Sequence, residues 1–308
     1  MPNRTPLFGR QQPGGALTVL DIEQHPGNIY FVDSGAAGGG DTVGHGQHPD
    51  TPFVTLDYAI GQATADQGDV IYVMPGHAET TTAEITVDKA GISIIGLGTG
   101  RNRPAITANF ASAGDTMAID SANVRIKNLR FVSSSASQNA QLDVTAADVV
   151  IEDCVFEVGA SNLICVTIAG GHRGKFLRNL VLATANGPDV AIDIQSSASD
   201  YWEVRDCVFN ATGFGFDLGV IRAAADNCIG WVIDNCQFLA CDTVAIDFNS
   251  SASVADGVVS RCYISATAAL TSIEDVVDWG GYHGFEVYAH DGTNATTAAA
   301  RIPIGTVS

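Results

Sequence analysis

A short pattern of apolar and polar positions returns seven times along the chain. In its clearest copy, V-R-I-K-N-L-R-F (Val124 to Phe131), apolar residues stand two apart on either side of a central polar residue. The copies centre on Gly96, Asn128, Asp153, Asn179, Asp206, Asn235 and Arg261, most of them 25 to 29 residues apart. Self-similarity at this period is typical of a stacked repeat, in which each unit packs on the next.

The pattern also predicts the geometry of each repeat. Before the centre, Val124 and Ile126 alternate as in a half-buried strand. After the centre the apolar pair is Leu129 and Phe131, one position out of phase. A continuous strand would turn this second pair to the wrong face, so we expect the backbone to bend at the central residue. Asn, Asp and Gly tolerate the left-handed conformation that such a bend requires.

A third apolar alternation follows the bend in most repeats. Its members are Leu142/Val144, Val166/Ile168, Val190/Ile192/Ile194, Leu218/Val220 and Val244/Ile246/Phe248. Three short strands per turn, with corner stacked on corner, predict an all-β fold. We expect a single-stranded right-handed parallel β-helix of about eight rungs.

Four cysteines fall at one position of the repeat. Cys154, Cys207, Cys236 and Cys262 come directly after the central residue, where other copies carry Leu97, Leu129 and Leu180. A position that accepts either Leu or Cys is apolar, so we expect a column of buried thiols. The seven cysteines include no C-x-x-C pair. We therefore expect free thiols in a protein made in a reducing cytoplasm, and neither disulfides nor a zinc site.

The ends of the chain differ from the repeats. We expect an N-terminal arm at residues 1–27, an N-terminal cap with a Gly-rich loop at 28–68, the β-helix at 69–279, and a C-terminal cap or tail at 280–308. Within the N-terminal cap, Ile29 to Val32 predicts a strand. Thr55 to Ala65 predicts a short helix that begins at a Thr55 cap. The apolar stripe of this helix, which covers the end of the β-helix, consists of Leu56, Ala59, Ile60 and Ala63.

Composition and charge exclude several classes of protein. Hydrophobic residues make up 46% of the chain, enough for a core, and only 16% of the residues are charged. The formal net charge of −19 argues against nucleic acid as a partner and disfavours binding to acidic polysaccharides. The N-terminal sequence lacks the apolar region of a secretory signal, and no run approaches the about 18 apolar residues of a membrane span. We expect neither secretion nor a membrane partner.

Two groups of residues resemble known functional motifs, but their sequence context does not support the functions that those motifs would indicate. Gly96-Leu-Gly-Thr-Gly100 is similar to a dinucleotide-binding loop, but the repeat continues through Ile106 where a phosphate-binding helix would have to begin. Gly44-His-Gly46 and Arg125-Ile-Lys127 resemble two motifs of the polygalacturonases, but here the two lie about 80 residues apart. We read Arg125 as the outward position of a rung.

One column of acidic residues is a candidate for chemistry. Asp120, Asp143, Asp193 and Asp247 share the outward position of the third strand, with Thr167 and Gly219 in the intervening rungs. Aspartates two rungs apart would lie about 10 Å from each other, in range of a paired-carboxylate mechanism or a calcium site. The alternative, which we favour, is a solvated face in which neutral residues dilute the charge.

Histidine offers no clear site. His25, His45, His48 and His77 gather in the N-terminal part without a spacing that would fix a metal ion. We assign no catalytic, cofactor-binding or metal-binding residue from the sequence and predict no cofactor.

Four segments carry a family resemblance. They are G-N-I-Y-F-V-D-S-G (Gly27 to Gly35), D-T-P-F-V-T-L-D-Y-A-I (Asp50 to Ile60), G-D-V-I-Y-V-M-P-G-H-A-E (Gly68 to Glu79) and A-G-I-S-I-I-G-L-G (Ala90 to Gly98). They resemble the pectin-lyase-like parallel β-helix proteins of tailed bacteriophages. The resemblance covers residues 27 to 104 and includes no catalytic residues.

The resemblance implies a non-enzymatic virion structural protein, either a head decoration or a fibre. It further implies a homotrimer that is made in the bacterial host cytoplasm, located on the virion and anchored by its N-terminal arm. Capsid or tail proteins are the expected partners, with a host surface glycan as a further candidate. The alternative is a tailspike depolymerase, a hydrolase or lyase that cuts bacterial surface polysaccharide. Aromatic residues make up only 7% of the chain and fall mostly at inward positions, which favours the non-enzymatic interpretation.

Overall fold

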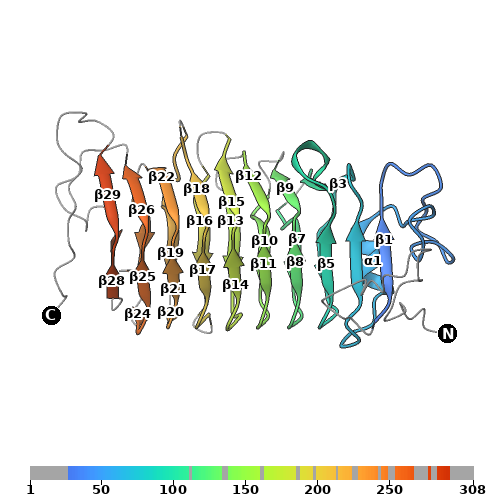
Figure 1. Ribbon diagram of the computed structural model, residues 1–308, viewed down its shortest axis with the longest axis horizontal. Coiled ribbons are helices and arrows are strands. Elements are labelled where there is room, and N and C mark those ends of the chain that lie inside the picture. Colours follow the sequence, from blue (N-terminus) through green and yellow to red (C-terminus); the bar gives the residue numbers. More distant parts are fainter. Residues whose placement is uncertain are drawn as a thin grey trace, which may run out of the picture.

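The chain forms a right-handed parallel β-helix, a rod whose turns stack along one axis (Figure 1). The computed structural model describes residues 27–110, 113–133, 138–159, 163–184, 188–196, 199–212, 214–223, 228–241, 244–248, 254–266, 277–278 and 283–291. Every pairing between named strands in this part is parallel, and each strand inside a sheet pairs with strands one turn before and one turn after it. The predicted fold class is confirmed.

Three sheets run the length of the rod, and each turn contributes one strand to each sheet. The first sheet contains β1 (Ile29–Val32), β2 (Val70–Val73), β5 (Ser93–Gly96), β8 (Arg125–Lys127), β11 (Val150–Glu152), β14 (Lys175–Leu177), β17 (Glu203–Arg205), β21 (Val232–Asp234), β25 (Val258–Ser260) and β28 (His283–Phe285). The second sheet contains β3 (Ala78–Thr81), β6 (Ala105–Ala108), β9 (Arg130–Ser133), β12 (Val155–Val158), β15 (Leu180–Ala183), β18 (Val208–Asn210), β22 (Gln237–Cys241), β26 (Tyr263–Ala266) and β29 (Tyr288–Asp291).

The third sheet is the one that positions the candidate site. It contains β4 (Ile85–Val87), β7 (Met117–Ile119), β10 (Ala140–Val144), β13 (Ile164–Ile168), β16 (Val190–Ile194), β19 (Gly219–Ala223), β23 (Ile246–Asp247) and β27 (Val277–Asp278). A separate pair joins β20 (Cys228–Ile229) to β24 (Val254–Ala255). One turn of 3-10 helix, η1 (Gly100–Asn102), precedes β6, so the glycine-rich segment before it leads back into the repeat.

The bend between the first and second sheets is made by residues in the left-handed conformation. Five of the predicted corner residues have φ between 51° and 57°: Asn128, Asp153, Asp206, Asn235 and Arg261. The prediction was wrong in two copies. Gly98, not Gly96, has the positive φ in the earliest copy, and Arg178 (φ 53°) replaces Asn179 in the fourth. The Arg178 side chain donates to Asp153 from its Nε atom (2.8 Å), which ties two neighbouring corners together.

Asn179 lies instead at the inward position that follows the corner. Its side chain is buried, accepts the Cys154 backbone N–H (2.8 Å) and donates to the Ile151 carbonyl (2.9 Å). Leu180, which we placed in this inward column, pairs with Val155 in the second sheet and is only partly buried. A buried amide is accepted in a column of thiols because both its polar ends find partners.

The core is a filled stack of apolar side chains. All seven cysteines are buried and none is part of a disulfide, which confirms the inward register of Cys154, Cys207, Cys236 and Cys262. Phenylalanine rings follow one another at centroid spacings of 5.1 to 6.4 Å through Phe131, Phe156, Phe176, Phe209 and Phe238. Trp202 and Trp231 stack at 5.9 Å, and the indole N–H of Trp202 donates to the Gly171 carbonyl. Apolar side chains therefore fill the interior of the rod, and we look for a functional site on its outer faces.

The N-terminal end of the rod is covered by a helix, as predicted. The helix α1 (Leu56–Gln62) begins at the cap Thr55, whose hydroxyl accepts the Tyr58 backbone N–H (3.4 Å). The four residues of the predicted stripe, Leu56, Ala59, Ile60 and Ala63, are buried. Figure 1 shows α1 and β1 at one end of the rod and β28 and β29 at the other. No helix in the described ranges is long and apolar enough to cross a membrane.

The division into arm, cap, β-helix and tail stays a prediction. Strands of the repeat extend from Ile29, within the predicted cap, to Asp291, within the predicted tail. The arm up to residue 26 and residues 292–308 lie outside the described residues.

Ion pairs connect neighbouring turns on the outside of the rod. Arg125 points outward, as predicted, and together with Arg178 it binds Glu152. Although burial raises the pKa of Glu152, the hydrogen bonds from the two guanidinium groups outweigh it, and the pKa is lowered. Such cross-strand pairs are the unit by which a sheet face is stabilised. The Arg125-Ile-Lys127 motif is therefore part of the scaffold.

Candidate functional site

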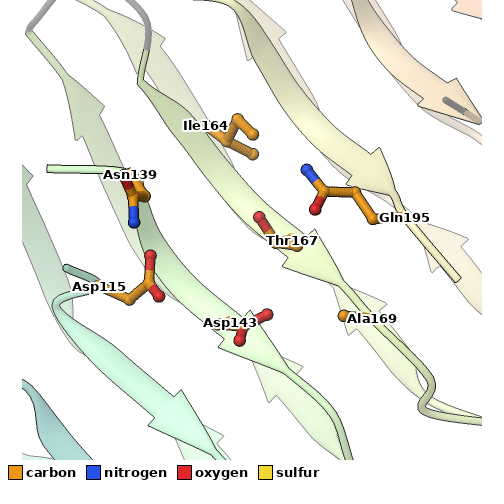
Figure 2. Close-up of a pocket in the computed structure, with 7 residues that line it drawn as sticks. All are labelled: Asp115, Asn139, Asp143, Ile164, Thr167, Ala169 and Gln195. Atoms are coloured by element: carbon orange, nitrogen blue, oxygen red, sulfur yellow. The ribbon is translucent and has the colours of Figure 1, made fainter. Parts of the chain in front are cut away.

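A polar cleft of about 370 Å³ lies on the outer face of the third sheet (Figure 2). Its lining comes from four successive turns and consists of Asp115, Asn139, Asp143, Ile164, Thr167, Ala169 and Gln195. Four turns at the spacing of neighbouring strands extend over about 14 Å along the rod. The cleft is therefore long in the direction of the axis.

Alternation in the strands positions the central residues of the cleft. Asp143 on β10 pairs in register with Thr167 on β13, and both point outward. Their neighbours Val144 and Ile168 point into the core and anchor the backbone. Asp115 and Asn139 precede β7 and β10, and Gln195 follows β16. Figure 2 shows the acidic side chains near one end of the cleft and Gln195 at the other.

The predicted acidic column is confirmed in part. The outward column reads Ala118, Asp143, Thr167, Asp193, Arg222 and Asp247 from turn to turn. The placement of Asp120 and Gly219 in this column was wrong. Asp120 comes directly after β7, where it accepts the Thr145 hydroxyl (2.9 Å).

The shift at Gly219 has a physical cause in the turn that contains β19. Gly219 pairs with Val190, so Ile221 and Ala223 continue the column of Ile192 and Ile194 in place of Leu218 and Val220, although Val220 is also buried in the core. Leu218 lies outside the strand and is 45% exposed. The connection before β19 is longer than in the neighbouring turns, and it moves the outward position from Gly219 to Arg222, an odd number of residues that exchanges the two faces of the expected alternation.

Asp193 is neutralised by its neighbours and shielded from solvent. Both of its oxygens accept from Arg222 (3.2 Å each), and Oδ2 also accepts from the Gln195 amide (2.8 Å). The residue is 0% exposed and is not part of the cleft lining. A buried carboxylate held in this way forms a structural ion pair and presents no oxygen to a ligand.

Asp143 has the opposite environment. Burial raises its pKa to about 6, and repulsion from Asp115, Asp120 and Glu84 adds to the effect, partly offset by the Val144 backbone N–H. Its Oδ1 atom is shielded from solvent and has no hydrogen-bond partner in the described part of the chain. This carboxyl group faces the cleft without a counter-charge, which is costly unless a ligand supplies one.

Asp115 is the second carboxyl group of the cleft. Its Oδ1 accepts the Ala140 backbone N–H (2.8 Å), which fixes its position beside β10. Burial raises its pKa, against the lowering effect of that hydrogen bond. The two cleft carboxyls therefore share one property, a pKa above the ordinary range.

The histidines of the N-terminal part make local contacts away from the cleft. His77 is buried, where its Nδ1 accepts the Ser34 backbone N–H (3.0 Å) and its Nε2 lies 3.2 Å from Glu79. His45 contacts Thr42 and His48 contacts Asp50, while His25 lies outside the described residues. Across the described ranges, no group of three or more His, Cys, Asp or Glu side chains is placed to hold a metal ion.

Three residues of the cleft were missed by reasoning on the sequence. Asp115, Asn139 and Gln195 stand just outside the third strands, where apolar alternation gives no information. A partial signal was present: an Asp or Asn stands just before the third strand in three copies, at Asp115, Asn139 and Asp189, whereas Leu163 holds this position before β13. Stacking brings such positions to one edge of the sheet.

The chain is similar to a solved structure of another protein. No protein-family model matches the chain, and no curated protein matches its sequence. A rhamnogalacturonan lyase structure is similar over 89% of this chain, with 16% sequence identity and a TM-score of 0.42. The matched region is 65% of that lyase chain, so this chain spans less than two thirds of its length.

Proposed function

We propose that this chain binds a glycan along the outer face of the third sheet. The observation that carries the proposal is the elongated cleft between Asp115 and Gln195, lined by carboxyl, amide and hydroxyl groups from successive turns. Such side chains both donate and accept hydrogen bonds, as the hydroxyl groups of a sugar do. A row of them at the spacing of the turns suits an extended chain of sugar rings better than a compact ligand.

The charge of the cleft selects among glycans. Among the described residues, no lysine or arginine lines the cleft, and Arg222 on the same sheet is engaged by Asp193. The carboxyls of Asp115 and Asp143 repel an acidic polymer, and the net charge of −19 does so at longer range. The ligand class that fits is a neutral or basic glycan.

Binding is a better fit than cutting. Glycoside hydrolysis by two carboxyls uses one as an acid and the other as a base or nucleophile, and their pKa values are pushed apart. In the cleft, burial raises the pKa of both Asp115 and Asp143. Asp193, the carboxylate two turns from Asp143, is covered by Arg222 and Gln195. We therefore propose a binding rod and not a depolymerase.

A binding assay with matched tryptophan substitutions tests this proposal. Thr167→Trp fills the middle of the cleft, and Thr107→Trp places the same side chain outward on the second sheet as a control. We expect the chain to bind at least one neutral bacterial surface polysaccharide and Thr167→Trp to weaken binding about tenfold or more, equal to about 1.4 kcal/mol. Thr107→Trp should bind as the parent does, with no new reducing ends released.

Two results would contradict the proposal. One is binding that is confined to acidic polysaccharides, and the other is equal loss of binding in the two tryptophan variants. Release of reducing ends that stops in Asp143→Asn would restore the depolymerase alternative.

We further propose that the rod belongs to a bacteriophage virion, as a head decoration or fibre assembled as a homotrimer on capsid or tail proteins. The resemblance of residues 27 to 104 to phage β-helix proteins supports this context. We expect deletion of residues 1–26 to leave the β-rich circular dichroism unchanged, because stacking contacts are made between neighbouring turns further along the chain. The truncated chain should fail to enter particles, measured by immunoblot of purified virions. Normal incorporation would assign the anchor to residues 280–308.

A further inference from the structure

The two ends of the cleft differ in charge. Asp115, Asn139 and Asp143 lie toward one end, and Ile164, Thr167 and Gln195 line the rest (Figure 2). The charged groups around the acidic end come from three elements. They are Glu84 before β4, Asp115 and Asp120 on either side of β7, and Asp143 on β10. All four are carboxyls, and the guanidinium group of Arg222, on β19 of the same sheet, is bound to Asp193.

The acidic end also has a hydrogen-bond acceptor that the protein does not use. The Asp143 Oδ1 atom is excluded from solvent and has no partner among the described residues. Elsewhere on the rod, outward carboxylates are paired with arginine, for example Glu152 with Arg178 and Asp234 with Arg261. A shielded carboxyl oxygen without a donor is costly in the free protein, and a positively charged donor from a ligand offsets that cost.

A cation of a particular kind fits this arrangement. A calcium ion requires six to eight oxygen ligands, and the described residues provide no preformed cluster of acidic ligands. A primary ammonium group needs only a few acceptors, since it carries three donors on one atom. Asp143 and Asp115 provide charged acceptors, and the neutral end of the cleft remains free for sugar hydroxyls.

We propose that the cleft selects a glycan with a free amino group, a deacetylated amino sugar whose ammonium group binds between Asp115 and Asp143. This inference rests on the glycan-binding function proposed above. The ammonium group lies against the carboxyl groups that Asp115 and Asp143 present to the cleft and supplies the missing counter-charge, while ring hydroxyls contact Thr167 and Gln195. The same sugar in its acetylated form lacks the charge and is bulkier at this point, so the pocket discriminates against it.

Calorimetric titration of the full chain with three tetrasaccharides of one linkage tests the inference. The probes are the tetramers of β-1,4-linked glucosamine, N-acetylglucosamine and glucose. We expect the glucosamine tetramer to bind about tenfold or more tightly than either of the others at neutral pH. The preference should shrink as salt is added, because a charge pair at a partly exposed site is screened.

Two aspartate variants and one control ligand complete the design. Asp143→Asn should abolish the preference for the amine, whereas Asp247→Asn, in the same outward column but outside the cleft, should retain it. Spermidine, which has amino groups but no sugar ring, should bind more weakly than the glucosamine tetramer.

Each other outcome contradicts a defined part of the argument. Equal binding of the three tetramers would overturn the amine preference and leave glycan binding intact. Spermidine binding as tight as that of the glucosamine tetramer would show that the cleft attracts cations in general and does not recognise the sugar. That result would overturn the inference. No binding of the glucosamine tetramer, with a neutral polysaccharide still bound, would also overturn it without affecting the proposed function.

Discussion

Replacement of Cys207 by aspartate should destabilise the rod by about 4 kcal/mol or more, the range expected for a buried unpaired charge. Cys207 is fully buried, and its thiol donates to the backbone carbonyls of Phe176 (3.3 Å) and Arg205 (3.1 Å). A carboxylate at this place meets those carbonyl oxygens without a donor to offer. We expect Cys207→Asp to unfold at a much lower urea concentration than the parent, or to accumulate as insoluble protein.

A matched substitution separates the charge from the change of side chain. Cys207→Ser has nearly the same size, is neutral and keeps one hydrogen-bond donor beside the two carbonyls, so it should lose far less stability than Cys207→Asp. Thiol labelling checks the register independently, since all seven cysteines are buried. The native protein should react slowly until it is unfolded. Rapid labelling of native Cys154, Cys207, Cys236 and Cys262, or equal damage by Ser and Asp, would contradict the inward column.

Asp143→Asn should have the opposite effect and stabilise the rod at alkaline pH. The pKa of Asp143 is raised from 3.8 to about 6, mainly by burial. Because the folded state holds the proton more tightly, this group favours folding most below pH 3.8, and the benefit is lost as pH rises through 6. The difference corresponds to about 3 kcal/mol, reduced to about 1 to 2 kcal/mol because the side chain is partly exposed.

Urea unfolding at about pH 4 and about pH 8 measures this effect. The midpoint of Asp143→Asn should exceed that of the parent at the higher pH and approach it at the lower pH. Asp247→Asn serves as the control for removal of one negative charge. A variant that is less stable than the parent at the higher pH would show that the Asp143 carboxylate is paired. A gain in stability together with a loss of glycan binding is expected where a residue lowers the stability of the fold but is needed for function.

Most of the fold could be predicted from the sequence, because each turn of the stack produces its own local alternation of apolar and polar residues. Val124, Ile126, Leu129 and Phe131 alone require two strands joined by a bend, and repetition of the pattern requires stacking. The misplaced corner at Arg178 has a clear reason. Arginine is an uncommon residue in the left-handed conformation, and only the folded rod places Asp153 one turn away to hold its side chain.

The candidate site was less accessible to such reasoning. Its central aspartate, Asp143, was predicted to point outward, but nothing local distinguishes it from Asp193 in the same column. The difference comes from Arg222, which lies next to Asp193 only after the longer connection before β19 shifts the register. The partners of each carboxylate therefore lie in neighbouring turns, about 25 to 29 residues away. Which residues become partners depends on loop lengths, and the alternation of apolar residues gives no information about them.

Because equivalent turns stack on one another, the length of this molecule can change during evolution by the gain or loss of whole turns. The strings V-A-I-D-I-Q-S-S-A-S (Val190 to Ser199) and V-A-I-D-F-N-S-S-A-S (Val244 to Ser253) are nearly the same. The pairing of Asp193 with Arg222, and of Arg222 with Asp247, places them two turns apart. A gene segment that encodes two turns can thus be copied or lost while the flanking strands meet new neighbours in register. Reach and number of binding positions can change in this way without a new fold.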